Sequence, residues 1–192
     1  MKNFLFASVL ALSFAAGASA APYEIDGRHA QVQFTYNHFG FSNITGRFDT
    51  ITGSFDFDAA KPEKSSISIE IPIASVSTGV AKLDTHLQSA DFFDAEKFPT
   101  ATFKSRKVTA AGEGKLDVAG DLTIHGVTRP VLLAVTINKV GKRNDKDTAG
   151  FDASVTLKRS DFGMDNYVPA VSDEVRISIT MESSAVVAAE AK

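Results

Sequence analysis

The stretch SISIEIPI, residues 66–73, places an isoleucine at every second position, with Ser, Glu or Pro between them. Successive side chains of a β-strand point to opposite faces, so this period of two predicts a strand with one apolar face. Pro72 lacks the backbone N–H that a sheet interior needs, which favours an edge strand or a bulge at that point. The stretch therefore indicates a half-buried sheet.

The same alternation recurs along most of the chain. Apolar residues take every second position in six further segments, at residues 32–38, 54–58, 115–124, 131–137, 151–158 and 175–182. Together with a shorter strand near residues 101–108, they predict about eight strands. One apolar face per strand is what an antiparallel sheet with one wet face requires. A barrel and a sandwich both meet this requirement, and the alternation alone leaves the two open.

One segment breaks the pattern. Within residues 80–93 the apolar side chains follow helical spacing, and His86 falls on the same side. The spacing predicts a short helix or a lid-like segment around these residues. The aromatic pair Phe92-Phe93 at its end would return apolar bulk to the sheet.

The N-terminus has the pattern of an export signal. Lys2 provides a positive start, residues 4–16 form an uncharged apolar run, and Ala18-Ser19-Ala20 matches a small-residue cleavage site. We expect a signal peptide over residues 1–20, cleaved between Ala20 and Ala21, and an exported mature protein. The folded domain then spans residues 21–184, and the Ala-rich residues 185–192 predict a disordered tail.

Composition excludes several classes of function. The chain of 192 residues contains no Cys, which rules out disulfides, thiolate zinc sites and a cysteine nucleophile. Its net charge of -3 offers no broad basic surface, so we expect no nucleic-acid partner. No apolar run reaches the roughly 20 residues that span a bilayer, so we expect no transmembrane segment in the mature chain.

The chemical motifs are weak. Asp84 and His86 are two positions apart, and side chains at that spacing on a helix do not face each other. The four His residues, at positions 29, 38, 86 and 125, form no pair at metal-ligand spacing. We therefore expect no catalytic residues, no metal site and no cofactor. His38 ends an apolar stripe, and we expect it to be hydrogen-bonded at the mouth of a barrel.

Three longer motifs carry a family resemblance: DTHLQSADFFD at residues 84–94, GDLTIHGVTRPV at residues 120–131, and RSDFGM at residues 159–164. With shorter segments between them, they make the chain resemble the YceI-like family of bacterial periplasmic, lipocalin-like proteins from Tyr23 to about Met181. The resemblance implies an eight-stranded antiparallel lipocalin-like β-barrel with an apolar pore. It also implies a periplasmic location and the binding of polyisoprenoid chains or similar long amphiphiles.

The leading interpretation is a periplasmic protein, not an enzyme, that binds or transports an isoprenoid or another long-chain lipid. Transient membrane contact fits this interpretation, as does a monomer or a homodimer. The residues expected to line the pore are Phe34, Tyr36, His38, Ile69, Ile71, Phe92, Phe93, Leu133 and Val135. Two alternatives stay open. One is an enzyme for an apolar substrate with His86 or His38 as acid or base. The other is a structural or stress-protective module with a filled core.

Overall fold

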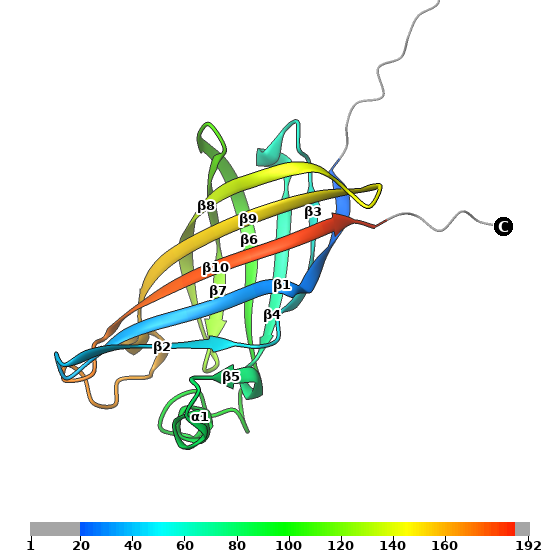
Figure 1. Ribbon diagram of the computed structural model, residues 1–192. Helices are drawn as coiled ribbons and strands as arrows, with labels where there is room; N and C mark the ends of the chain where they lie inside the picture. Colours follow the sequence, from blue (N-terminus) through cyan, green and yellow to red (C-terminus); the bar gives the residue numbers. More distant parts are fainter. Residues whose placement is uncertain (1–19, 187–192) are drawn as a thin grey trace, which may run out of the picture.

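A computed structural model describes residues 20–186 of the chain (Figure 1). Its elements, in chain order, are β1 (Ala21–His38), β2 (Ser42–Phe48), β3 (Thr52–Phe57), η1 (Pro62–Lys64), β4 (Ser66–Pro72), η2 (Ile73–Ser75), β5 (Val76–Ser77), α1 (Ala81–Gln88), β6 (Thr100–Gly112), β7 (Lys115–Ile124), β8 (Val127–Arg143), β9 (Lys146–Lys158), η3 (Arg159–Phe162) and β10 (Glu174–Ala185). Strands dominate, and α1 is the single α-helix of these residues. No helix within residues 20–186 is long and apolar enough to cross a membrane.

The strands form one antiparallel sheet that closes on itself. Its order is β10, β9, β8, β7, β6, β4, β3 and β1, and β1 then pairs with β10. The closing register sets Phe34 opposite Ile177 and Tyr23 opposite Ala185. The predicted eight-stranded antiparallel barrel is therefore confirmed.

β1 borders two different strands along its length. Its first residues, from Ala21 to Glu24, pair with β3, whereas Val32–His38 pair with β2. β2 and β3 therefore follow one another along the same side of β1, and the short β5 pairs with the end of β2. The chain then forms α1, which lies at the opposite end of the molecule from the start of β1 and the end of β10 (Figure 1). The helix or lid-like segment predicted around residues 80–93 is confirmed.

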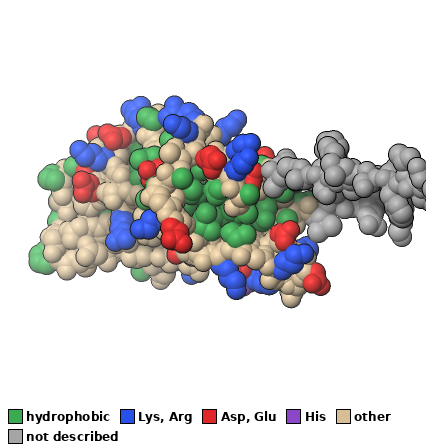
Figure 2. Space-filling model, turned by 90° about the horizontal axis from the view of Figure 1, so that it is seen from above, with side chains coloured by type: hydrophobic (Ala, Val, Ile, Leu, Met, Phe, Trp, Pro, Cys, Tyr) green, Lys and Arg blue, Asp and Glu red, His purple; other side chains and the backbone are tan. Residues whose placement is uncertain are grey.

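The alternation of the sequence sets which side chains face inward. Along β8, Val131, Leu133 and Val135 are partly buried, whereas Leu132 and Ala134 between them are exposed. Figure 2 shows hydrophobic side chains gathered in the middle of the face seen from above, with charged side chains around them. Along β8 the alternation thus separates partly buried positions from exposed ones, as the period of two predicts.

Two glycines allow aromatic rings to lie close against a neighbouring strand. Gly46 lies opposite Phe34 in the β1–β2 pair, and the Phe34 ring occupies the space that a Cβ at Gly46 would need. The Phe103 ring of β6 lies against Gly120 of β7 in the same way. Both rings are buried. Glycine is needed at these positions because a side chain would displace a buried ring.

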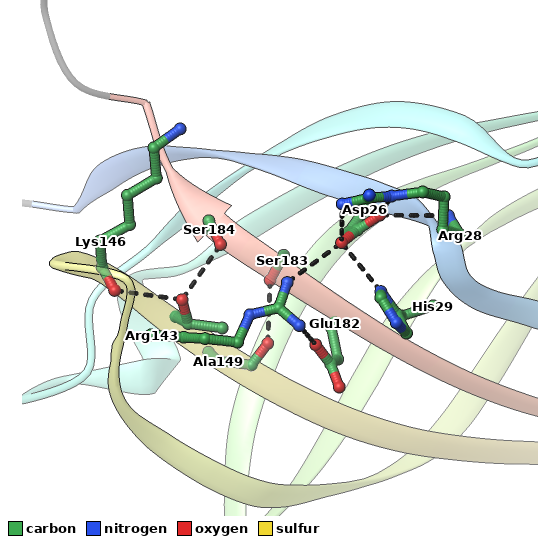
Figure 3. A network of polar contacts seen from close by, with 10 residues as sticks. Asp26, Arg28, His29, Arg143, Lys146, Ala149, Glu182, Ser183 and Ser184 are labelled. Atoms are coloured by element: carbon green, nitrogen blue, oxygen red, sulfur yellow. Dashed lines mark hydrogen bonds and ion pairs between the residues drawn. The ribbon is translucent and has the colours of Figure 1, made fainter.

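A polar network joins β1 to the β8–β9 hairpin across β10 (Figure 3). The Asp26 carboxylate accepts hydrogen bonds from Arg28 Nε at 3.1 Å and Arg143 at 3.1 Å, and contacts His29 Nδ1 at 2.9 Å. Arg143 also forms an ion pair with Glu182 at 2.8 Å. The hydrogen bond from Arg28, followed by that from His29, holds the pKa of Asp26 well below its ordinary value of 3.8. The network lies where a bulge interrupts the β1–β10 ladder, so it bridges the weakest part of that seam.

The C-terminal end of the barrel extends slightly beyond the expected domain. Ala185, placed by the sequence at the start of a disordered tail, is the last residue of β10. The backbone N of Val186 donates to the Pro22 oxygen at 2.9 Å. Residues 1–19, which carry most of the expected signal peptide, and residues 187–192 of the expected tail lie outside the described residues.

Candidate functional site

The barrel encloses an apolar cavity of about 470 Å³. This volume is within the range of about 300–1,000 Å³ that is typical of ligand pockets. All nine residues expected to line a pore lie on its wall: Phe34, Tyr36, His38, Ile69, Ile71, Phe92, Phe93, Leu133 and Val135. The apolar stripes of the strands thus face inward in the expected register. That these side chains contact a ligand stays a prediction.

Inward-facing side chains near α1 are not fully buried. Ile71, Ile124 and Val175 line the cavity, yet each keeps part of its surface accessible. Because they point into the barrel, that accessible surface faces the cavity. The cavity therefore shows that the interior is not filled throughout, and the structural or stress-protective role stays a hypothesis.

The other end of the barrel interior is packed with aromatic rings. Tyr23, Phe55, Phe57 and Phe151 are all buried. The distances between contacting ring centroids range from 5.2 Å, for Phe57 and Phe151, to 6.1 Å, for Phe55 and Phe57. These separations are those of directly contacting aromatic pairs. Phe55, Phe57 and Phe151 also line the cavity, so these rings form its wall at this end, which we call the packed end.

The cavity reaches the surface where the β1–β2 hairpin meets the loop between η3 and β10. Phe39 and Tyr167 line the cavity and are also exposed to solvent. The two segments are joined by backbone hydrogen bonds, from Phe39 N to the Ala170 oxygen at 2.7 Å and from Ser172 N to the Asn37 oxygen at 2.9 Å. We call this opening the mouth.

A second pair of contacts ties α1 and its following turns to the mouth. The Phe92 ring stacks on Tyr167 with centroids 6.3 Å apart. Asn166 Nδ2 donates to the backbone oxygen of Asp91 at 2.6 Å. Because Phe92 also lines the cavity, this segment covers one side of the mouth while its apolar side chains face inward.

Asp84 has a structural task at the start of α1. Its Oδ1 accepts hydrogen bonds from the Thr78 backbone N at 2.7 Å and from Thr78 Oγ1 at 2.6 Å. His86 instead packs against the edge of Phe92 with centroids 5.0 Å apart. Asp84 therefore does not orient His86, as the helical spacing predicts.

One cation lies in the apolar wall at the mouth end. Arg159 of η3 is buried, and its guanidinium donates to the backbone oxygens of Met164 at 2.7 Å, Val171 at 2.9 Å and Ser172 at 3.0 Å. Within residues 20–186 no carboxylate forms an ion pair with it. Burial lowers the pKa of Arg159 and raises that of Tyr36, which lines the same cavity.

The sequence contained a signal for Arg159 that was overlooked. The inward stripe of β9 runs through Phe151, Ala153, Val155 and Leu157, and the next position in the same register is Arg159. A cation at an inward position of an apolar strand marks a polar site at the strand end. Phe39 and Tyr167 were missed for another reason, because loop residues carry no periodicity from which a direction could be predicted.

Two of the four histidines, His38 and His86, lie on the cavity wall. Within residues 20–186, neither imidazole ring forms a hydrogen bond. The side-chain hydrogen bond expected for His38 is absent among these residues; its ring packs on Phe39 with centroids 4.7 Å apart. His125 Nδ1 contacts the Phe162 backbone oxygen at 3.1 Å. In the same part of the chain no three His, Cys, Asp or Glu side chains form a cluster that could hold a metal.

Sequence comparison finds relatives along almost the whole chain. The family model of the YceI-like domain matches residues 23–183. A UPF0312 protein of Pseudomonas syringae pv. tomato is 45% identical over 187 residues, covering 95% of this chain and 97% of the relative. A UPF0312 protein of Ectopseudomonas mendocina is 42% identical over 188 residues, again covering 95% of this chain and 97% of the relative.

Solved structures share the barrel. BcnA of Burkholderia cenocepacia matches with a TM-score of 0.76 and 29% identity, over 82% of this chain and 98% of BcnA. A Campylobacter jejuni YceI protein matches with a TM-score of 0.74 and 34% identity, over 79% of this chain and 90% of that protein. A polyisoprenoid-binding domain of Saccharophagus degradans matches with a TM-score of 0.67 over 88% of this chain and 100% of that domain; at 18% identity, this likeness concerns the fold alone.

Proposed function

The chain belongs to the YceI-like family, and from this premise we propose that it binds or carries an isoprenoid or another long-chain amphiphile in its barrel. The observation that carries the proposal is the apolar cavity of about 470 Å³ that opens at the mouth. We also propose that the protein acts in the periplasm, because residues 1–20 have the pattern of a signal peptide.

The wall of the cavity suits a ligand with an apolar tail and a polar end. In this proposal the tail lies along Ile71, Ile124 and Leu133, which leave accessible apolar surface inside the barrel. The polar end lies toward the mouth, near Tyr36 and Arg159. Arg159 supports this orientation because it is a buried cation on the cavity wall. The carboxylates of Asp165 and Asp173 act on its charge without forming an ion pair with it.

The energetics favour a carrier over a permanent store. Burying one CH₂ group from water is worth about 0.8 kcal/mol, so a long chain would bind from water almost irreversibly. Such a chain normally resides in a membrane, where its CH₂ groups are already out of water. The driving force for binding is then the difference between two apolar environments, which is small enough to permit release.

The first ligand to test is a polyisoprenoid. The Saccharophagus degradans domain, which has the same fold, is described as polyisoprenoid-binding. Organic extraction of the purified protein, followed by mass spectrometry, should release a long-chain lipid. Extraction of no lipid, together with no uptake of added geranylgeraniol, would refute the proposal.

Two neighbouring leucines on β8 provide a matched test of the cavity. Leu133 lines the cavity, whereas Leu132 is exposed on the outer face of the same strand. We expect Leu133→Asp to weaken geranylgeraniol uptake at least tenfold, because the charge would be desolvated against the apolar tail. Leu132→Asp should bind as the wild type does. Equal effects of the two substitutions, in variants whose circular dichroism is native, would show that the ligand lies elsewhere.

A further inference from the structure

We propose that the mouth of the barrel docks on a lipid bilayer, with the tips of two adjoining loops inserted among the lipids. This proposal rests on the carrier function and adds the surface through which the ligand would be exchanged. The rim, as we call it, comprises the β1–β2 turn with the first residues of β2, residues 39–45, and the loop residues 166–172.

The rim is uncharged. Neither residues 39–45, FGFSNIT, nor residues 166–172, NYVPAVS, contain Asp, Glu, Lys, Arg or His, although charged residues make up 22% of the chain. The two loops lie side by side, because Phe39 and Ala170 are joined by a backbone hydrogen bond of 2.7 Å. At the left tip of Figure 2, the end where β1 meets β2 in Figure 1, hydrophobic and uncharged side chains prevail.

The rim also holds the exposed aromatic side chains. Phe41 is 91% exposed, Tyr167 57%, Phe39 50% and Val168 37%. The other large apolar side chains exposed among residues 20–186 are the aliphatic Val80, Leu132, Val140 and Val186. A group of exposed aromatic residues on one surface marks an interaction site. Aromatic side chains of this kind are favoured at the interface between a membrane and water.

The position of the rim favours a bilayer over a protein as the partner. Phe39 and Tyr167 belong both to the rim and to the wall of the cavity. Apolar surface therefore runs without interruption from the tips of the loops into the barrel. A long-chain lipid could pass from the bilayer into the cavity along this surface without crossing water. A protein partner could bind the exposed rim residues alone, so it would not explain why the apolar surface continues from the rim into the cavity.

The rim contains no basic residues, which distinguishes apolar insertion from electrostatic attraction as the kind of membrane contact. Proteins that use Lys and Arg bind anionic lipids and are released by salt. The rim has no cation, so its contact must come from apolar insertion. Neutral and anionic membranes should consequently bind it about equally, and salt should not release it.

The chain contains no Trp, which allows a single fluorescent reporter at the rim. Phe41→Trp should show a blue shift of its emission when phosphatidylcholine vesicles are added, because the indole leaves water. Leu132→Trp is the matched control, since Leu132 is exposed on the outer face of the barrel. Its emission should stay unchanged. Absence of a shift for Phe41→Trp would overturn the proposal, as would binding limited to phosphatidylglycerol vesicles and abolished by salt.

Loss of the apolar tip should weaken docking. Phe41→Ser should reduce binding to phosphatidylcholine vesicles about tenfold in a flotation assay, because a large apolar side chain no longer inserts. Leu132→Ser should float as the wild type does. Equal flotation of the wild type and Phe41→Ser would contradict docking through the rim.

A vesicle-free assay separates docking from ligand binding. Geranylgeraniol offered from cyclodextrin tests the cavity without any membrane. Uptake in this assay combined with no vesicle binding would overturn docking and leave the carrier function intact. Vesicle binding without uptake would support docking and refute the carrier function. Docking and the carrier function are both supported if the protein takes up geranylgeraniol from cyclodextrin and if geranylgeraniol passes from vesicles to Phe41→Ser more slowly than to the wild type.

Discussion

The packed end and the mouth end of the barrel are built from the same alternating strands, yet their inward side chains pack differently. At the packed end, Phe55 and Phe57 from β3 contact Phe151 from β9, and these buried rings form the cavity wall there. At the mouth end, the inward positions carry aliphatic side chains such as Ile71 and Ile124, which leave space between opposite walls. Contacting rings thus pack one end of the barrel interior, whereas the mouth end combines aliphatic side chains with rings such as Tyr36 and leaves space between opposite walls.

This difference suggests a division of tasks between the two ends. Close packing at one end provides stability, because buried apolar surface and ring contacts stabilise the fold. Incomplete packing at the other end gives up some of that stability and provides a space for a ligand. We therefore expect substitutions at the packed end to act mainly on stability and those at the mouth end mainly on binding.

The largest expected effect comes from removing a ring at the packed end. Phe57→Ala should lower the free energy of unfolding by about 3–5 kcal/mol, because it removes a buried ring and leaves a cavity. Ile124→Ala at the mouth end should cost about 1 kcal/mol, since the isoleucine is only partly buried. Urea unfolding monitored by circular dichroism measures both. Equal losses would contradict the division between the two ends.

An intermediate effect is expected at Gly46, a tightly packed position within the mouth half. Gly46→Ala should cost about 1–3 kcal/mol, because the new methyl group would displace the buried Phe34 ring. Gly150→Ala is the control, since its Cβ would meet no atom closer than 3.9 Å. Thermal unfolding of the two variants tests this. A Gly46→Ala protein as stable as wild type would show that the ring moves freely into the cavity.

The smallest expected effect is a loss of stability at low pH, and it arises from Asp26 near the packed end. The pKa of Asp26 is lowered in the folded protein, so its carboxylate stabilises the fold above the ordinary value of 3.8. That contribution should be lost as the pH falls below this value through the folded pKa. Asp26→Asn should lower the urea midpoint at neutral pH, and its midpoint should change less with acid than that of the wild type.

Asp56→Asn on the exposed face of β3 serves as the control for this acid effect. Its urea midpoint should follow the wild-type pH dependence. The wild type and Asp26→Asn could instead show the same dependence of the urea midpoint on pH. That result would mean that the network of Figure 3 does not contribute to stability in acid.

Sequence and structure contributed differently to this picture. The period of two in stretches such as residues 66–73 was sufficient to predict the strands and the side chains that face inward, because strand geometry is local. The break around residues 80–93 was likewise visible as a change of period. Family motifs then favoured a hollow barrel over a sandwich, which the alternation by itself could not do.

Other features depended on segments distant in sequence. Arg159 reaches three backbone oxygens of the loop before β10, and the rim joins residues 39–45 to residues 166–172. Neither contact follows from a local pattern, because loops have no periodicity and their positions depend on how the barrel closes.

The sequence by itself determined the strands, the apolar inward face and the uncharged character of the two rim segments. Only the tertiary structure decided that rings contact one another at one end of the interior while a cavity remains between the walls. The physical reason is that side-chain direction follows from the backbone of each strand alone. Whether opposite walls meet depends on ring size and strand placement around the whole barrel.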